Sequence, residues 1–375
     1  MNELEGLLVV SVEHAVAAPF ASARLADAGA RVVKVERPEG DFARGYDALV
    51  NGDSAYFVWL NRGKQSVRLD LKADADRAVL SALLEQADVL IQNLGPGVMK
   101  RLGFGAEALL AARPDMIICS ITGYGAEGPR ASQKAYDLLI QAESGICAIN
   151  GTPEGMARVG VSICDISAGM NAYQAILEGL IGRGITGKGR IIDVSLFHAM
   201  AEMMNVPYLQ HRYGGFTPGR HGLQHPSIAP YGAFPCSDGK ALLLSVQNDR
   251  EWRDLCRIAM MRPDLAEAPD FATNTARVAN RAEVDGIVAA HMAKAGREAN
   301  IALLDAARIA YGRLSDLDDL QAHPQNRLIT VAAPHGDVEM MAPGASVRGE
   351  ARSYGAAPAL DAQGAAIRAE FGPDR

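Results

Sequence analysis

Asp165 is the residue of this chain whose type and setting point most directly to chemistry. It follows the apolar run RVGVSIC (158–164) and precedes apolar residues at helical spacing, among them Met170 and Tyr173. This position is typical of a helix N-cap, where aspartate is favoured. It also suits a carboxylate nucleophile, because the small Gly169 leaves space for an acyl group and helix N–H groups stabilise a developing oxyanion. The two interpretations are compatible, and both stay open at this point.

Basic side chains follow the strand-like run RVVKVE (31–36). Arg37 and Arg44 lie beyond its carboxyl end, where ligands collect in α/β sheets. Further cations stand at similar loop positions: Arg68, Lys72, Arg101 and Lys134. Each of them alone is equally compatible with solvated surface charge. Together they favour a polyanionic ligand, since guanidinium groups bind phosphate well.

Two Gly-rich turns also follow predicted strands, at 93–97 (NLGPG) and 123–128 (GYGAEG). Such turns admit the close backbone approach of a ligand. The first strand-to-helix turn contains no GxGxxG, which disfavours a dinucleotide site, and no GxSxG elbow supports a hydrolase. His221 and His225 have no Cys or carboxylate at zinc-site spacing, so no metal site is expected. Cys164 has no basic neighbour in sequence and is expected to be a buried structural thiol.

Strand-like and helix-like segments alternate along the first third of the chain. Strands are expected at 7–13, 31–36, 87–93 and 115–121, and helices near 19–29, 73–86 and 104–112. A β-α-β order implies parallel strands joined by crossover helices. We therefore expect an α/β fold with a doubly wound parallel sheet.

The character of the sequence changes at about residue 203, where Gly and Pro accumulate up to about 240. This stretch is expected to be loop and linker. A strand-like run at 240–247 and helical segments follow it. We expect a large domain at 1–205, completed by about 328–375, and linkers with a smaller α+β domain at 206–327.

The composition is that of an ordinary globular protein, with 375 residues of which 49% are hydrophobic and 22% are charged. The net charge of −7 argues against binding to a nucleic-acid backbone. The first residues lack the basic segment and the long apolar run of a signal peptide, and no run is long enough to span a bilayer. The five cysteines form no CxxC pair and are typical of reduced thiols. We expect a cytoplasmic protein that has neither a membrane nor a nucleic acid as a partner.

Several segments, in order, resemble the family III CoA-transferases, which include formyl-CoA transferase, carnitine CoA-transferases and the α-methylacyl-CoA racemases. The segments that carry the resemblance lie between about residues 4 and 260: LEGLLVVSVEHAVAAPFASARLADAGARVVKVERPEGDFAR, NRGKQSVRLDLK, VLIQNLGPGVMKRLGF, SITGYGAEGP, YDLLIQAESG, GVSICDISAGMNAYQAIL, GRIIDVSLFHAM and HPSIAPYGAFPCSDG. The resemblance implies a Rossmann-like large domain that binds CoA, a smaller domain, and a homodimer of two chains interlocked like rings.

The resemblance also implies that an acyl-CoA is a substrate and that no cofactor is bound permanently. In this family an active-site aspartate attacks the thioester and becomes in turn a mixed anhydride and an aspartyl-CoA thioester. The aspartate of that motif falls on Asp165. The positions that match the family's CoA site are Val16, Arg37, Val67, Asn93, Arg101 and Lys134. Those that match its substrate loop are Tyr136, Gly214, Gly215 and His221.

Two departures from the family pattern bear on the substrate. Formyl-CoA transferase has a glutamine where this chain has Val16, which argues against a formyl/oxalate specificity. Racemases have a histidine where Tyr136 stands, and a tyrosine with its reference pKa of about 10 handles an α-proton poorly at neutral pH. We expect CoA to pass from an acyl-CoA such as succinyl-CoA to a small acid, for example itaconate, mesaconate or malate. The alternatives are an acyl-CoA racemase or intramolecular CoA isomerase, and a CoA-binding protein without catalysis.

Overall fold

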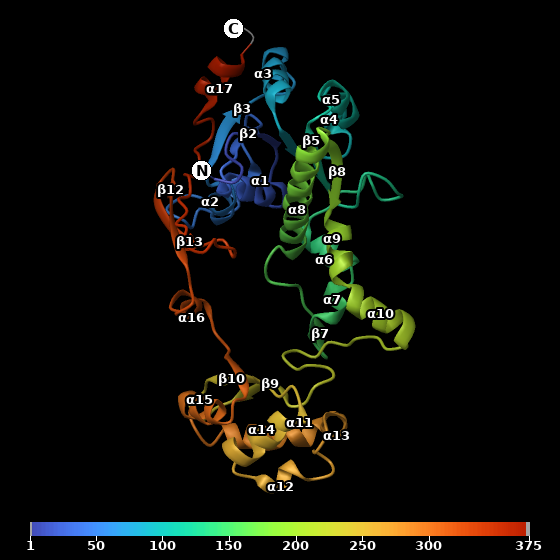
Figure 1. The fold of residues 1–375 in the computed structure, drawn as a ribbon, viewed down its shortest axis with the longest axis vertical. Helices are drawn as coiled ribbons and strands as arrows, with labels where there is room; N and C mark the ends of the chain where they lie inside the picture. Colours follow the sequence, from blue (N-terminus) through green and yellow to red (C-terminus); the bar gives the residue numbers. More distant parts are fainter. Residues whose placement is uncertain (1, 373–375) are drawn as a thin grey trace. The chain divides into compact units, whose positions relative to one another are not determined.

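The computed structural model describes residues 2–372 and contains two compact units (Figure 1). The first unit comprises Met1–Cys147, Arg158–Leu209 and Arg327–Arg375, and the second comprises Ala148–Ala157 and Gln210–Asn326. The second unit is thus assembled from two separate stretches of the chain.

Six parallel strands form the central sheet of the first unit. Their order is β3 (Lys64–Arg68), β2 (Arg31–Glu36), β1 (Leu8–Val12), β4 (Val89–Gln92), β5 (Ile117–Thr122) and β8 (Arg190–Ser195). Valine, isoleucine and leucine dominate β1 and β4 at its centre, because a parallel sheet is covered on both faces. The expected α/β class with a parallel sheet is confirmed, and the four strands predicted from the sequence are β1, β2, β4 and β5.

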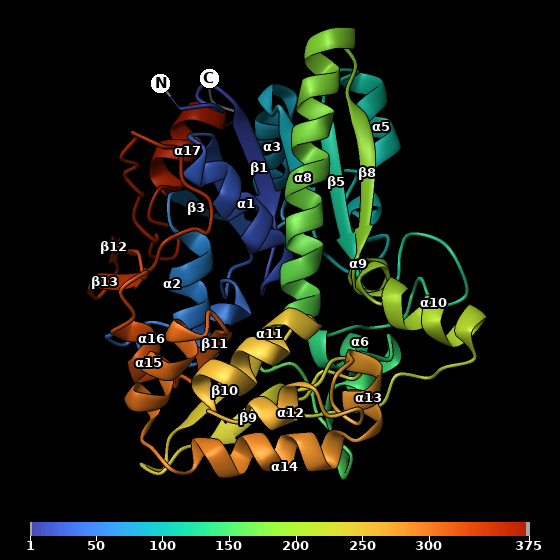
Figure 2. The same cartoon turned by 60° about the horizontal axis from the view of Figure 1, so that its bottom comes forward.

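Helices cover both faces of this sheet, as Figure 2 shows for α1 and α8 in front of it and α3 and α5 behind it. One face packs against α1 (Ala17–Asp27) and α8 (Ile163–Thr186), and the other against α3 (Asp74–Gln86), α4 (Val98–Arg101), α5 (Ala106–Ala112) and α17 (Gly364–Phe371). Successive strand residues point to opposite faces, so Val9 joins the first core and Val10 the second. The predicted helices near 19–29, 73–86 and 104–112 are confirmed as α1, α3 and α5.

The remaining elements of the first unit are short. They are the 3₁₀ turn η1 (Phe42–Gly45), α2 (Ala55–Asn61), α6 (Asp137–Glu143), α7 (Ile146–Ile149, at the boundary of the units), α9 (Leu196–Met203) and the antiparallel hairpin of β12 (Leu328–Ala333) and β13 (Gly336–Met341). Two of them, η1 and α6, begin just after loops that follow β2 and β5.

The second unit has an antiparallel sheet in the order β11 (Ala310–Arg313), β10 (Ala241–Ser245) and β9 (Tyr231–Pro235), and a small hairpin of β6 (Gly151–Thr152) and β7 (Gly155–Met156). Its helices are α11 (Asp249–Asp254), the π-helical turn η2 (Leu255–Ala259), α12 (Pro263–Ala266), α13 (Asn274–Ala279), α14 (Arg281–Met292), α15 (Arg297–Ala306) and α16 (Leu317–Gln321). They enclose a separate core around the fully buried Trp252.

The prediction that 203–240 is loop and linker is wrong in two places. α10 (Asn205–Gly214) lies within it, and Pro207 is tolerated there because the first turn of a helix needs no backbone donor. β9 also lies within it, and its residues pair with β10, for example Phe234 with Leu242. Pairing with the next strand along the chain therefore stabilises β9, and the local Gly and Pro content does not show this pairing.

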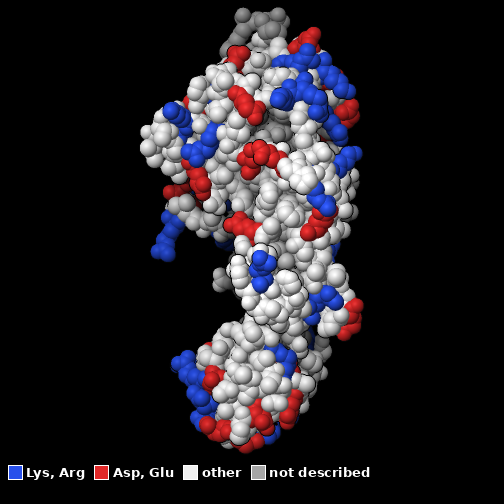
Figure 3. All heavy atoms as spheres, turned by 90° about the vertical axis from the view of Figure 1, so that its right-hand side faces the viewer, with Lys and Arg blue, Asp and Glu red and all other residues white. Residues whose placement is uncertain are grey.

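The surface view shows no uniformly basic face on the side that it draws. Lys and Arg side chains gather near one end of the first unit there, with Asp and Glu side chains among them (Figure 3). In residues 2–372 we find no helix that combines the length and the apolar character needed to cross a bilayer.

Gly169 allows α8 to lie close against the start of α1. A Cβ atom at Gly169 would stand 2.7 Å from the carbonyl oxygen of Ala17 and 2.9 Å from Cβ of Phe20. These distances are shorter than van der Waals contact, so only glycine fits without movement of the backbone. The contact lies one helical turn beyond Asp165 and therefore sets where that side chain stands relative to the turn between β1 and α1.

We expect Gly169→Ala to lower the free energy of unfolding by about 1–3 kcal/mol, because the added methyl overpacks the contact between α1 and α8. The matched control is Gly184→Ala in the same helix, where a Cβ meets nothing within 4 Å. It should raise stability by up to about 1 kcal/mol through helix propensity. Urea unfolding followed by circular dichroism measures both, and equal effects of the two substitutions would contradict the close-contact assignment.

Candidate active site

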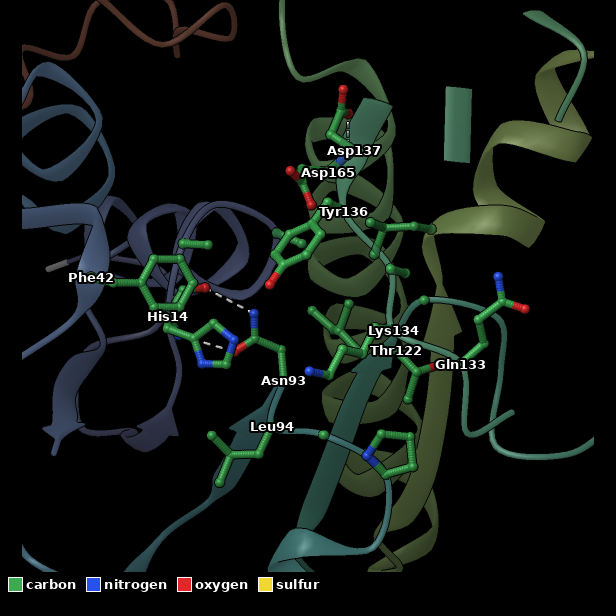
Figure 4. Close-up of a pocket in the computed structure, with 18 of the residues that line it drawn as sticks. His14, Phe42, Asn93, Leu94, Thr122, Gln133, Lys134, Tyr136, Asp137 and Asp165 are labelled. Atoms are coloured by element: carbon green, nitrogen blue, oxygen red, sulfur yellow. Dashed lines mark hydrogen bonds between the residues drawn. The ribbon is translucent and has the colours of Figure 1, made fainter. Parts of the chain in front are cut away.

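A cavity of about 290 Å³ lies beyond the carboxyl ends of β1, β4 and β5. Loops at this edge of a parallel sheet converge, which is why ligands collect there. The turn after β1 contributes His14 and Ala15, and the turn after β4 contributes Asn93 and Leu94. The last residue of β5, Thr122, and the first residue beyond it, Gly123, also line the cavity. Helices and their flanking residues complete the wall with Phe42, Tyr46, Gln133, Lys134, Tyr136, Asp137 and Asp165 (Figure 4).

Asp165 stands in the first turn of α8, as its third residue. The N-cap residue is Ser162, so the prediction that Asp165 is the N-cap is wrong. Ser162 does not use its hydroxyl as a cap, and its Oγ lies 3.2 Å from the hydroxyl of Tyr56 instead. The side chain that caps this helix comes from another element.

Asp137, the first residue of α6, binds the start of α8. Its Oδ1 accepts hydrogen bonds from the backbone N–H groups of Cys164 at 2.8 Å and Asp165 at 3.2 Å. Its Oδ2 accepts a bond of 2.7 Å from Nε2 of Gln141. The backbone N–H groups of Cys164 and Asp165 are therefore already bonded to a carboxylate. The expectation that N–H groups at this helix end stabilise an oxyanion is wrong for these two groups.

The environment of Asp165 disfavours its charge. Burial and, secondarily, the charge of Asp137 raise the pKa of Asp165 to about 7. Within the described residues, no group donates a hydrogen bond to its carboxylate, although the side chain is only partly buried. The start of α8 does not offset this effect, because Asp137 already accepts hydrogen bonds from its N–H groups.

The turn after β1 is held against the turn after β4. The N–H of His14 donates to Oδ1 of Asn93 at 3.0 Å, and Nδ2 of Asn93 donates to the carbonyl of His14 at 2.9 Å (Figure 4). The imidazole of His14 lies against the ring of Phe42, with centroids 4.9 Å apart. Val16 is buried at the start of α1 and does not line the cavity.

A second cavity of about 540 Å³ adjoins the first along the same edge of the sheet. It lies at the ends of β2 and β3, and His14, Phe42 and Leu94 line both cavities. Arg37 and Lys72 provide cations at its wall. Nε of Arg37 donates to the carbonyl of Gly40 at 2.8 Å, and the guanidinium stays more than half exposed.

The other predicted positions fall into three groups. Lys134 and Tyr136 line the first cavity, where the resemblance had led us to expect them. Val67 is fully buried in the core and Arg101 is exposed at the end of α4, so neither lines the two cavities. The positions expected in the substrate loop beyond Tyr136 belong to the second unit and stay predictions: Gly214, Gly215 and His221.

The inference from the sequence missed three side chains of this site. Asp137 was assigned no role, although it begins α6 and acidic residues are favoured in the first turn of a helix. Phe42 and Tyr46 carry no such signal, because their side chains reach the cavity only through the fold of the loop after β2. Burial raises the pKa of the Cys164 thiol to about 12, in keeping with a structural thiol.

Metal chemistry finds no support in the donor set. Within residues 2–372, no three His, Cys, Asp or Glu side chains lie close enough to hold a metal ion. The carboxylates of Asp137 and Asp165 are the two acidic groups at the first cavity. A carboxylate of raised pKa at the wall of a cavity is an arrangement typical of covalent or acid–base catalysis.

Comparison with known proteins agrees with this chemistry. The model of CoA-transferase family III matches residues 4–364. The chain is 36% identical to the acetyl-CoA:oxalate CoA-transferase of Acetobacter aceti, over 98% of this chain and 95% of that protein, and 34% identical to the succinyl-CoA:glutarate CoA-transferase of Mus musculus, over 87% and 75%. A CAIB/BAIF family protein from Brucella suis has the same fold, with a TM-score of 0.88, 34% identity and coverage of 99% and 100%. The chain belongs to CoA-transferase family III and is a CoA-transferase.

Proposed function

We propose that this enzyme moves CoA from an acyl-CoA to a small dicarboxylic acid, with Asp165 as the nucleophile. The observation that carries the proposal is the Asp165 carboxylate at the wall of the first cavity, with a raised pKa and without a hydrogen-bond donor in the described part of the chain. Such a group is not stabilised as a static carboxylate, and its oxygen is free to attack an acyl carbon.

The two adjoining cavities suit the two ends of an acyl-CoA. The nucleotide end fits the larger cavity, where Arg37 and Lys72 offer charge to its phosphates. The shared wall of His14, Phe42 and Leu94 leads from there to the smaller cavity, which holds Asp165. The thioester then lies beside the nucleophile.

The reaction divides into two halves. A carboxylate oxygen of Asp165 attacks the acyl carbon, the C–S bond breaks, and a mixed anhydride and CoA thiolate result. The thiolate attacks the carbonyl carbon of Asp165 and releases the donor acid, leaving an aspartyl-CoA thioester. The acceptor carboxylate then attacks this thioester, and CoA thiolate attacks the acceptor half of the new anhydride and restores Asp165. Each step exchanges one activated acyl bond for another, so no ATP is required.

The acceptor is proposed to be a dicarboxylate, because the relatives above are named for oxalate and glutarate. Oxalate belongs among the candidates although this chain has Val16 where formyl-CoA transferase has a glutamine. Succinyl-CoA is the proposed donor, and Tyr136, Gly214, Gly215 and His221 the proposed substrate loop. The same proposal includes three further properties that the family membership supports. They are an interlocked homodimer, a Rossmann-like large domain and a cytoplasmic location.

Replacement of the nucleophile tests the scheme directly. We expect Asp165→Ala to lower CoA transfer by roughly 10⁴-fold or more, as loss of a covalent nucleophile does elsewhere, while CoA still binds. Asp115→Asn, which changes an aspartate before β5 and outside both cavities, is the control and should leave transfer intact. Transfer assayed by chromatography of acyl-CoAs gives the answer, and a fully active Asp165→Ala enzyme would refute the role.

The raised pKa predicts how the first half-reaction depends on pH. Only the carboxylate attacks, so the rate of acyl transfer to the enzyme should fall as the pH drops through about 7. Asp137→Asn keeps an acceptor oxygen for α8 but removes the neighbouring charge, which should lower the pKa of Asp165 and move this fall to lower pH. The shift should be partial, because burial is the larger cause. Rapid-quench mass spectrometry measures the rate, and a profile unchanged by Asp137→Asn would contradict the assignment.

The cations of the larger cavity should contribute to binding rather than to chemistry. We expect Arg37→Ala and Lys72→Ala each to raise KM for the acyl-CoA by about 3- to 30-fold with kcat nearly unchanged, because each loses an exposed contact to phosphate. Lys188→Ala, beyond the carboxyl end of α8 and away from both cavities, is the control. Steady-state kinetics measures KM and kcat for each variant. An unchanged KM would contradict the assignment of the CoA phosphates to this cavity.

A further inference from the structure

Four charged side chains are buried beneath the turn between β1 and α1. Glu13, Lys34, Asp41 and Lys64 each expose 4% or less of their surface. Glu13 directly follows β1, Lys34 lies within β2 and Lys64 begins β3, three adjacent strands, and Asp41 lies in the loop after β2. Buried ion pairs are no more stabilising than well-packed apolar residues of the same volume, so stability alone does not account for four of them in one place.

The four side chains form one continuous network. Nζ of Lys34 lies 2.8 Å from Oδ2 of Asp41 and 3.4 Å from Oε1 of Glu13. Nζ of Lys64 lies 2.6 Å from the same Oε1. Burial opposes the charge of Glu13, but Lys64 and Lys34 lower its pKa to about 2. Both lysines thus contact the carboxylate of Glu13, and Glu13 and Asp41 also line the larger cavity.

Asp41 connects this network to the backbone of the turn. Its Oδ1 accepts hydrogen bonds from the N–H of Ala15 at 3.1 Å and the N–H of Ala43 at 2.9 Å. Ala15 has a φ of +62°, a left-handed conformation that is unfavourable for any residue with a Cβ. The hydrogen bond from its N–H thus holds a backbone conformation that alanine does not adopt by itself.

The same turn is part of the wall between the two cavities. His14 lines both of them and Ala15 lines the first. On its other side the turn is fixed by the paired hydrogen bonds of His14 with Asn93. A change in the backbone at Ala15 would therefore move the imidazole of His14 and alter the passage that a bound CoA occupies in the proposed function.

We propose that Asp41, held by the buried Lys34, is a positioning residue that keeps the turn at Ala15 in the shape that binds acyl-CoA. The inference rests on the proposed function, because it assigns the turn to the CoA site. Asp41 does not touch the reacting atoms, and its oxygens are taken by backbone N–H groups and by Lys34. Asp41 affects CoA binding indirectly, because it sets the fraction of molecules in which the turn at Ala15 has the conformation that binds CoA.

The test combines Asp41→Asn with Ala15→Gly. Asp41→Asn breaks the ion pair with Lys34 and weakens the hold on the turn, so the Kd for CoA should rise about tenfold at unchanged protein fold. Ala15→Gly should change binding little by itself, since the turn is already held. In the Asp41→Asn background it should restore most of the affinity, because glycine adopts a positive φ without strain. A purely structural role of Asp41 predicts no such rescue.

Asp27→Asn is the matched control. Asp27 is the last residue of α1, and its side chain is 7% exposed. Its carboxylate pairs with Arg62, with Nε of Arg62 2.9 Å from Oδ1. This variant should lose stability without a change in Kd. Where Asp41→Asn alone does not fold, Lys34→Met/Asp41→Asn also removes the buried cation that has lost the closer of its two partners, and it takes the place of the single variant in the comparison.

Isothermal titration with CoA, supported by thermal unfolding of each variant, gives the result. A raised Kd for Asp41→Asn, its recovery with Ala15→Gly and an unchanged Kd for Asp27→Asn support the inference. Wild-type binding by Asp41→Asn, or a loss that Ala15→Gly does not restore, overturns this inference alone. A wild-type chain that binds no CoA overturns the proposed function together with it.

Discussion

The Asp137 carboxylate accepts hydrogen bonds from the first turn of α8, and the character of the site depends on this interaction. It joins α6 to α8 and satisfies backbone donors that the helix itself leaves free. It also brings a second negative charge to Asp165, which burial has already made costly to ionise. A residue that is an ordinary first-turn aspartate by position thus becomes a carboxylate of raised pKa at the wall of a cavity.

Close packing gives this carboxylate a defined place. Gly169 lets α8 approach α1, and α1 begins where the turn after β1 ends. That turn is pinned from one side by Asn93 and from the other by Asp41. Asp165, the turn at His14 and the larger cavity therefore lie along the same edge of the sheet. Under the proposed mechanism, reactivity at Asp165 and affinity for the nucleotide end depend on different side chains, so substitutions can separate them.

Much of the fold could be predicted from the sequence, and Asp165 could be identified as the candidate catalytic residue. The residues that surround Asp165 in space could not be predicted. The strands β1, β2, β4 and β5 and the helices between them have strong local patterns, so they were predicted correctly. α10 and β9 were missed because Gly and Pro dominate the composition around them. The contact between Asp137 and Asp165 joins residues 28 apart in sequence, and no local pattern encodes it. Likewise Val67 matched a family motif, yet its side chain lies in the core.

The central claim is that the Asp165 side chain, carried as its CoA thioester, forms an anhydride with the acid that receives CoA. A single turnover with an acceptor dicarboxylate whose carboxylate oxygens are ¹⁸O tests it most directly. When CoA thiolate attacks the acceptor half of the anhydride, one labelled oxygen stays on the enzyme. Mass spectrometry of the peptide that contains Asp165 should therefore find one ¹⁸O atom in that side chain, and none in the Asp165→Ala protein. Efficient CoA transfer without label at Asp165 would contradict the proposed mechanism.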